Sequence, residues 1–205
     1  ERTESAVTLN GVRLELLDLG RGLDIKRVRG EPAGEPLDLH VTDYDSPDSL
    51  VNLVVPLGTA ARVTVPGIDR PLAGRGDTHF WHLPEERWAD YHIPAGVRIA
   101  SGGLGLSLEF LADIAQGQRL PAPLRHLLDK GRSPPFLLGR RTGPELRRAV
   151  RALHDNPFHG RMELLFAEGK AMEIAAYALA ALQAPEPARR PALTAWEIHR
   201  IHEAK

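Results

Sequence analysis

The pattern of turns and apolar residues changes near residue 110, and this change constrains the fold more than any other feature of the sequence. Before it, clusters of Gly, Pro and Asp separate short apolar stretches of the kind that form strands. We expect strands over residues 49–57, 61–65, 78–83, 91–93 and 97–110. Because these strands are short and evenly spaced, they predict a β-sandwich or a small barrel for the first part of the chain.

After Leu111 the apolar residues follow a helical period. Pro144 fits the first position of a helix, and Leu146, Val150 and Leu153 follow at spacings of four and three residues. A second helix is predicted to start after the Asn156-Pro157 pair and to run from about Phe158 to Gln183. The change from strands to helices indicates an α+β fold.

The second predicted helix is apolar over most of its circumference. Its polar residues Glu163, Lys170, Glu173 and Tyr177 fall on one stripe. A helix of this kind must be covered on more than one side. Either the preceding helix and the sheet cover it, or a second subunit does so as well.

Composition and charge exclude several classes of protein. The chain has 205 residues and no cysteine, so disulfides, thiolate metal sites and cysteine nucleophiles are excluded, and we expect a cytoplasmic protein. The longest apolar stretch, residues 171–182, is too short to cross a membrane. Residues 1–115 carry 11 Lys and Arg against 18 Asp and Glu, whereas residues 116–205 carry 15 against 9. Any DNA contact is therefore expected late in the chain, although the pattern of Arg147, Arg148 and Arg151 favours the solvated face of a helix.

A proline-rich segment separates the predicted helices from the end of the chain. Residues 184–192 have the composition of an extended linker. Thr194 and Glu197 then form a capping box that opens one more helix. We interpret residues 193–205 as the first helix of a domain that continues past Lys205. The predicted order is a β-domain over 1–115, a helical region over 116–183, the linker, and this helix.

Histidine and aromatic residues concentrate between residues 79 and 92. On a strand, His79 and Trp81 share one face, while Phe80 and His82 share the other, so the two histidines point apart. A histidine and carboxylate metal site is one interpretation of this cluster, and a core or a ligand pocket lined by aromatic rings is another. The candidate ligand-binding residues are His79, Trp81, His82, Trp88, Tyr91 and His92.

No motif in the chain points to catalysis. Gly102, Gly103 and Gly105 do not form a G-x-G-x-x-G fingerprint, and close backbone packing explains them. A G-x-S-x-G nucleophile elbow is lacking, and no spacing of carboxylates singles out an acid and base pair. We therefore expect no catalytic residues, no resident metal and no cofactor.

Two segments late in the chain resemble one family. Residues 156–174, from Asn156-Pro157-Phe158-His159-Gly160 to Ala171-Met172-Glu173-Ile174, are similar to a segment of AraC-type transcription regulators of the pyochelin-regulator branch. Residues 193–205 are similar to the opening of that family's helix-turn-helix domain, with Glu197 at a position where Asp is commoner. Residues 94–98 and 104–111 resemble the end of its regulatory β-domain.

The resemblance implies a cupin-like β-sandwich that binds an effector, helices that form a homodimer, and a DNA-binding domain that lies past Lys205. The implied effector is a small molecule, either a ferric siderophore or another small aromatic compound. The chain itself is then not expected to bind DNA specifically. The expected dimer contact is made by Met162, Leu165, Met172, Ala176 and Leu179. A cupin-type metal-dependent enzyme is the alternative, but the spacing of His79 and His82 differs by one residue from the cupin His-x-His motif.

Overall fold

The computed structural model describes residues 4–42, 51–58, 62–65, 68–72, 77–83 and 88–183. Strands and helices follow one another along the chain, with the helices confined to the second half. The strands are β1 (Glu4–Leu9), β2 (Val12–Asp18), β3 (Leu23–Gly30), β4 (Leu37–Thr42), β5 (Val51–Pro56), β6 (Arg62–Val65), β7 (Ile68–Leu72), β8 (Asp77–His82), β9 (Trp88–Ile93), β10 (Ile99–Leu106) and β11 (Phe136–Arg141). The helices are α1 (Leu108–Ile114), α2 (Ala122–Lys130), α3 (Pro144–His154) and α4 (Arg161–Gln183).

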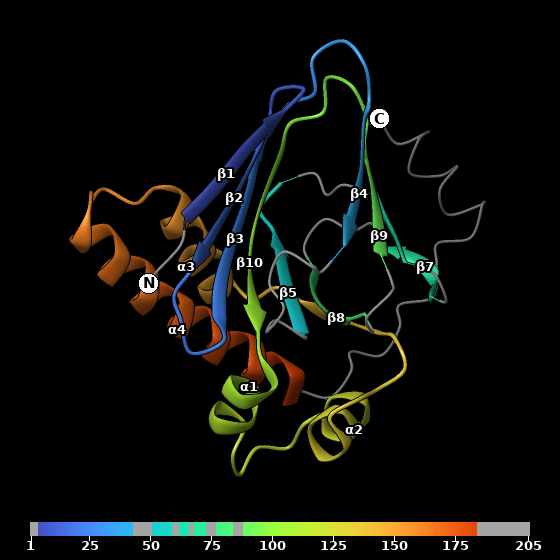
Figure 1. The fold of residues 1–205 in the computed structure, drawn as a ribbon, viewed down its shortest axis with the longest axis vertical. Coiled ribbons are helices and arrows are strands. Elements are labelled where there is room, and N and C mark those ends of the chain that lie inside the picture. Colours follow the sequence, from blue (N-terminus) through green and yellow to red (C-terminus); the bar gives the residue numbers. More distant parts are fainter. Residues whose placement is uncertain are drawn as a thin grey trace, which may run out of the picture.

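Two antiparallel sheets face each other to form a sandwich (Figure 1). The larger sheet has the strand order β1-β2-β3-β10-β5-β8-β11, and the smaller has the order β4-β9-β6-β7. A tight turn at Asn10 and Gly11, with φ angles of 44° and 80°, joins β1 to β2. This Asn-Gly pair suits a hairpin, because both residues tolerate positive φ.

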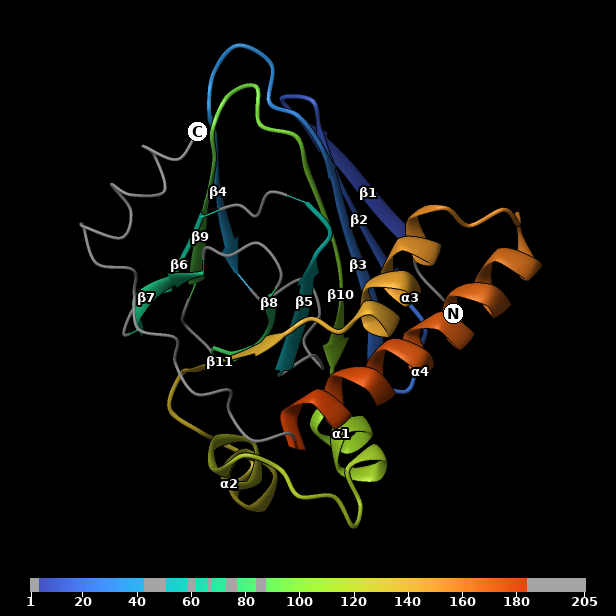
Figure 2. The same ribbon diagram turned by 180° about the vertical axis from the view of Figure 1, so that it is seen from behind.

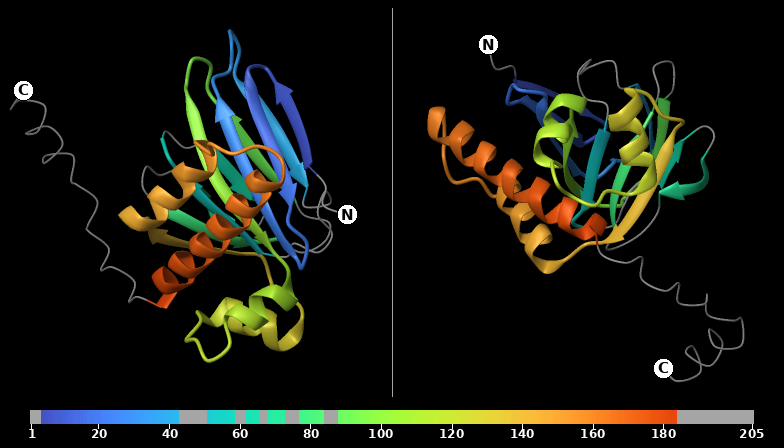
Figure 3. Two further views of the ribbon diagram at one scale, coloured as in Figure 1. Left: turned by 90° about the vertical axis from the view of Figure 1, so that its left-hand side faces the viewer. Right: turned by 90° about the horizontal axis from the view of Figure 1, so that it is seen from below.

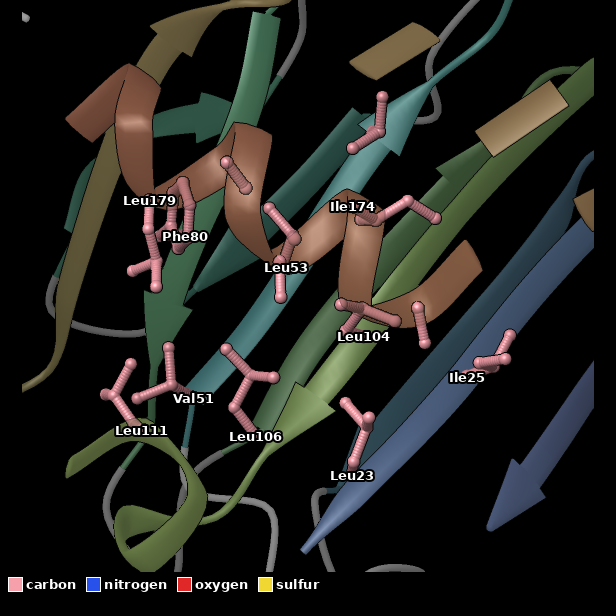
Figure 4. Close-up of a cluster of buried hydrophobic side chains, with 14 of the residues drawn as sticks. Leu23, Ile25, Val51, Leu53, Phe80, Leu104, Leu106, Leu111, Ile174 and Leu179 are labelled. Atoms are coloured by element: carbon pink, nitrogen blue, oxygen red, sulfur yellow. The ribbon is translucent and has the colours of Figure 1, made fainter. Parts of the chain in front are cut away.

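Helices α3 and α4 cover the outer face of the larger sheet (Figure 2). The main apolar core lies in this interface, where Ile174 and Leu179 of α4 pack above Leu53, Phe80 and Leu104 of the sheet (Figure 4). Each of these five side chains is 6% exposed or less. Gly102 lets α3 approach β10, because a Cβ atom there would lie 2.6 Å from Cγ1 of Val150.

Helices α1 and α2 lie together at one end of the sandwich (Figure 3). Strand β10 ends at Leu106, and Ser107 caps α1, since its Oγ accepts a hydrogen bond from the Phe110 backbone N at 3.1 Å. The prediction of a strand through Phe110 is therefore wrong over its last residues. A serine that can accept this bond favours a helix start over continued pairing.

The helix predicted from Pro144 is confirmed as α3. The next helix begins at Arg161 rather than at Phe158. Asn156 does not cap it: its Oδ1 accepts a hydrogen bond from the Phe158 backbone N at 3.0 Å, which forms a local turn before the helix.

The α+β class is confirmed, with a β-sandwich followed by helices. The region over 116–183 is not helical throughout, however, because β11 pairs with β8 and extends the larger sheet. Strands β1 to β4 and strand β7 were not among the predicted strands. The predicted linker over 184–192 and the predicted helix over 193–205 lie outside the described residues. None of the helices in the described part of the chain is long and apolar enough to span a bilayer.

Candidate functional site

The inner face of the larger sheet carries polar side chains where a sandwich core is usually apolar. Register places Asn52 of β5 opposite Trp81 of β8, and Val54 opposite His79. On the other side of β5, Gly105 and Gly103 of β10 lie opposite Asn52 and Val54. On the far side of β10, Asp24 of β3 lies opposite Gly105, and Lys26 lies opposite Gly103. Alternation along each strand then turns all of these residues to the face opposite α3 and α4.

Trp81 lies on β8, next to the edge strand β11, and is 3% exposed. Its ring packs in a small apolar cluster with Val63, Val65 and Ala89 of the smaller sheet. Among the described residues, its Nε1 has no hydrogen-bond partner. A buried N–H group without a partner is rare in folded proteins and needs an explanation.

His79 lies two residues before Trp81 on the same face. Neither of its buried ring nitrogens has a hydrogen-bond partner in the part of the chain that the structure describes. Burial lowers the pKa of His79, and the nearby carboxylate of Asp77 opposes this shift. The imidazole is therefore neutral near pH 7, with one nitrogen able to donate and the other able to accept a hydrogen bond.

The structure adds Lys26 and Asn52 to the inner face, two residues that the sequence did not single out. Lys26 Nζ donates a hydrogen bond to Asn52 Oδ1 at 2.6 Å across β10. Lys26 follows the buried Ile25 in a strand of alternating character, a pattern that normally places the lysine in solvent. Only the pairing of distant strands shows that the lysine belongs to an inner face.

The predicted ligand-binding residues separate into different locations. His79 and Trp81 share the inner face, and Tyr91 of the smaller sheet packs against the Trp81 cluster. His82 lies on the opposite face of β8, where its ring centroid is 5.6 Å from that of Phe136. His92 is half-exposed, and its Nδ1 lies 2.7 Å from Oδ1 of Asp38, on the outer surface. Trp88 begins β9, but its side chain lies outside the described residues.

The described residues contain no group of three or more His, Asp or Glu side chains that could hold a metal ion. His79 and His82 project from opposite faces of β8, as the alternation of a strand predicts. These two histidines therefore do not converge on one point.

The helical half presents an exposed apolar stripe on α4, which we define as Met162, Leu165, Met172 and Ala176. The side chains of the first three are 55%, 62% and 45% exposed. Spacings of three, seven and four residues keep the stripe on one side of the helix. Leu179, predicted to belong to the same contact, does not: it is 6% exposed and packs in the main core against the sheet.

A groove of about 380 Å³ runs between α3 and α4 beside this stripe. Glu145 and Arg148 of α3 line one wall, and their side chains approach to 3.4 Å. Lys170 and Glu173 of α4 line the other and form an ion pair at 2.6 Å. The polar stripe predicted for α4 thus faces α3, with its charges paired along each helix.

Comparison with known proteins identifies the family. A family model described as "Regulatory protein PchR N-terminal domain" matches residues 13–193. The chain belongs to this family. The resemblance to the pyochelin-regulator branch is thereby confirmed, and the sandwich with its helices is a PchR-type regulatory domain. No curated protein matches the chain.

Several solved structures match the chain at low sequence identity and low structural similarity. AerE from Microcystis aeruginosa is 13% identical over 51% of this chain and 46% of its own, with a TM-score of 0.36. Oxalate decarboxylase OxdC from Bacillus subtilis is 14% identical over 77% and 43%, with a TM-score of 0.35. Procruciferin, an 11S globulin from Brassica napus, is 14% identical over 96% and 52%, with a TM-score of 0.37. The chain spans about half the length of these proteins.

Proposed function

We propose that this chain is the ligand-sensing and dimerisation part of an AraC-type DNA-binding transcription regulator. The effector binds between the two sheets, at His79, Trp81 and Tyr91. The observation that carries this proposal is the set of buried ring nitrogens of His79 and Trp81, which have no partner among the described residues of a regulatory domain. A bound molecule that supplies the missing hydrogen bonds would remove the cost of leaving these groups unpaired.

The proposed effector is a ferric siderophore or another small aromatic molecule. The rings of Trp81 and Tyr91 offer faces on which aryl groups can stack. The neutral imidazole of His79 can hydrogen-bond the ligand without placing a charge in the interior. Valine and alanine side chains of the Trp81 cluster supply the apolar remainder of such a site.

Dimerisation through the α4 stripe is the second part of the proposal. Three large apolar side chains on one stripe of a helix are costly to leave in water, and a second copy of the helix would bury them. DNA would be contacted by a helix-turn-helix domain that follows the linker over 184–192, and the protein would act in the cytoplasm. Ligand binding would thus be communicated to DNA through the helices on the outer face of the sheet.

We propose that the domain is not an enzyme. The alternative, a cupin-type metal-dependent enzyme, requires histidines that converge on one ion. His79 and His82 lie on opposite faces of β8, and His92 lies on the outer surface of the other sheet. This arrangement favours a sensor over a metal-dependent enzyme.

The experiment that tests the sensor is thermal unfolding of the chain with a panel of ferric siderophores. A ligand at 100 times its Kd should stabilise the fold by about 2.7 kcal/mol. Trp81→Phe removes the unpaired N–H but keeps an aromatic ring, and should weaken binding about tenfold. His92→Gln, on the outer surface, is the matched control and should bind as the parent does. If Trp81→Phe and His79→Phe both remain folded and bind with the parent's affinity, the proposed site is wrong.

A further inference from the structure

Lys26 is a half-buried cation that forms no ion pair with a described carboxylate. Its Nζ donates a hydrogen bond to the neutral amide oxygen of Asn52 at 2.6 Å. Asp24, the carboxylate nearest to it along β3, is already engaged in an interaction of its own. An amide oxygen satisfies one of the three ammonium hydrogens but cannot balance the charge.

Glycines on the neighbouring strand keep the ammonium group accessible from the interior. Lys26 lies opposite Gly103 of β10, and Asn52 lies opposite Gly105. At Gly103 a Cβ atom would lie 2.1 Å from the backbone O of Leu53, so no larger residue fits there. The strand between Lys26 and Asn52 therefore has no side chains on this face to cover the ammonium group.

The free donors of this face lie along a line across the sheet. Lys26 is on β3 and Trp81 is on β8, with β10 and β5 between them. Three strand spacings of about 4.8 Å separate their backbones by about 14 Å. At the β3 end of this line, Lys26 presents a positive charge. At the β8 end, His79 and Trp81 present neutral ring N–H donors next to an aromatic surface.

We propose that the effector of this domain is an organic anion, whose negative group binds Lys26 Nζ while its aromatic or apolar body lies against Trp81. This inference rests on the proposed function, because it concerns the same inner face. An anionic oxygen makes a shorter and stronger bond to an ammonium group than a neutral acceptor does. The partner of a partly desolvated lysine is therefore a group of opposite charge, and the aromatic end of the face sets the chemistry of the rest of the ligand.

Two fluorescent probes with the same aromatic body separate charge from shape. One is 8-anilinonaphthalene-1-sulfonate, which carries a sulfonate, and the other is N-phenyl-1-naphthylamine, which is neutral. The parent chain should bind the sulfonated probe at least tenfold more tightly. Lys26→Met should remove most of this difference by weakening the sulfonated probe about tenfold and changing the neutral probe less than about threefold.

Three further variants serve as controls. Lys26→Arg keeps the charge and should restore binding of the sulfonated probe to within about threefold of the parent. Lys130→Met, at the exposed end of α2, makes the same change in net charge and should have no effect. Trp81→Phe should weaken both probes, because the phenyl ring offers their aromatic bodies a smaller contact surface than the indole does. Circular dichroism establishes that each variant is folded.

The outcomes distinguish this inference from the proposed function. If Trp81→Phe weakens both probes but Lys26→Met leaves the advantage of the sulfonated probe unchanged, the site is where we place it and the ligand is not selected for negative charge. If Trp81→Phe leaves both probes unchanged, neither the proposed site nor the anion preference stands. If the loss at Lys26→Met is reversed by Lys26→Arg and absent at Lys130→Met, the anion preference is established.

Discussion

Leu165→Glu should disrupt a dimer formed through the α4 stripe. Leu165 is the most exposed of its large apolar residues, with 62% of its surface accessible. Complete burial of a leucine contributes about 1.5–3 kcal/mol, so burial of the exposed part contributes about 1–2 kcal/mol in each protomer. A symmetric dimer contains two copies of the residue, and the substitution removes about 2–4 kcal/mol. Each 1.4 kcal/mol changes Kd about tenfold, so Kd should rise by at least about 30-fold.

Sedimentation velocity over about 1 to 100 µM protein measures this change, since µM affinity corresponds to about 8 kcal/mol of binding free energy. Leu9→Glu is a matched control, because Leu9 is an exposed leucine of β1, 41% accessible and distant from α4 in the fold. The control should dimerise as the parent does. A parent that remains monomeric at 100 µM, or a Leu165→Glu variant with the parent's Kd, would refute the assignment of the stripe as the dimer contact.

The remaining predictions concern stability and are checked by chemical denaturation. Because burial lowers the pKa of His79, the unfolded chain binds more protons than the folded chain below about pH 6.5. The free energy of unfolding should therefore fall as the pH is lowered from about 7.5 to 5.5. His79→Phe should reduce this pH dependence. A slope that is equal in parent and variant would show that His79 does not titrate differently on unfolding. Glu15→Ala should cost about 3–5 kcal/mol, since it leaves the mostly buried Arg27, 2.8 Å from the Glu15 carboxylate, without its ion pair. Gly102→Ala should cost about 1–3 kcal/mol, because the new Cβ would lie 2.6 Å from Cγ1 of Val150, and a loss below 0.5 kcal/mol would mean that α3 shifts freely.

Local sequence signals predicted the parts of the fold that local physics decides. The change from strands to helices is marked by Gly and Pro punctuation and by apolar spacing, and the start of α3 follows directly from Pro144. The separation of His79 from His82 follows from the alternation of a strand. The end of β10 was not predicted correctly, because an apolar run such as 97–110 fits either a strand or a helix until the Ser107 cap is recognised.

Features that depend on pairing between distant segments could not be predicted. Strand β11 is set by its partner β8, more than fifty residues earlier, and its own sequence lies in a helix-rich region. The inner location of Lys26 depends on the pairing of β3 with β10 and on the helices that cover the opposite face of β3. Leu179 has the spacing of the exposed stripe, yet the tilt of α4 on the sheet places it in the core. By contrast, Asn10-Gly11 and the alternation of residues 12–17 were available signals for the first hairpin.

The most direct test of ligand sensing between the sheets is the indole N–H resonance of Trp81 in a spectrum of the isotope-labelled chain. Trp81 can be distinguished from Trp88 and Trp196, the other two tryptophans, by single substitution to Phe. A bound ligand, with gallium(III) replacing iron in a siderophore complex to avoid paramagnetic broadening, should move this resonance downfield as Nε1 gains an acceptor. The exchange of the Trp81 indole proton with solvent should slow, while the Trp196 resonance stays in place. Saturable binding that leaves the Trp81 resonance unchanged would contradict the account.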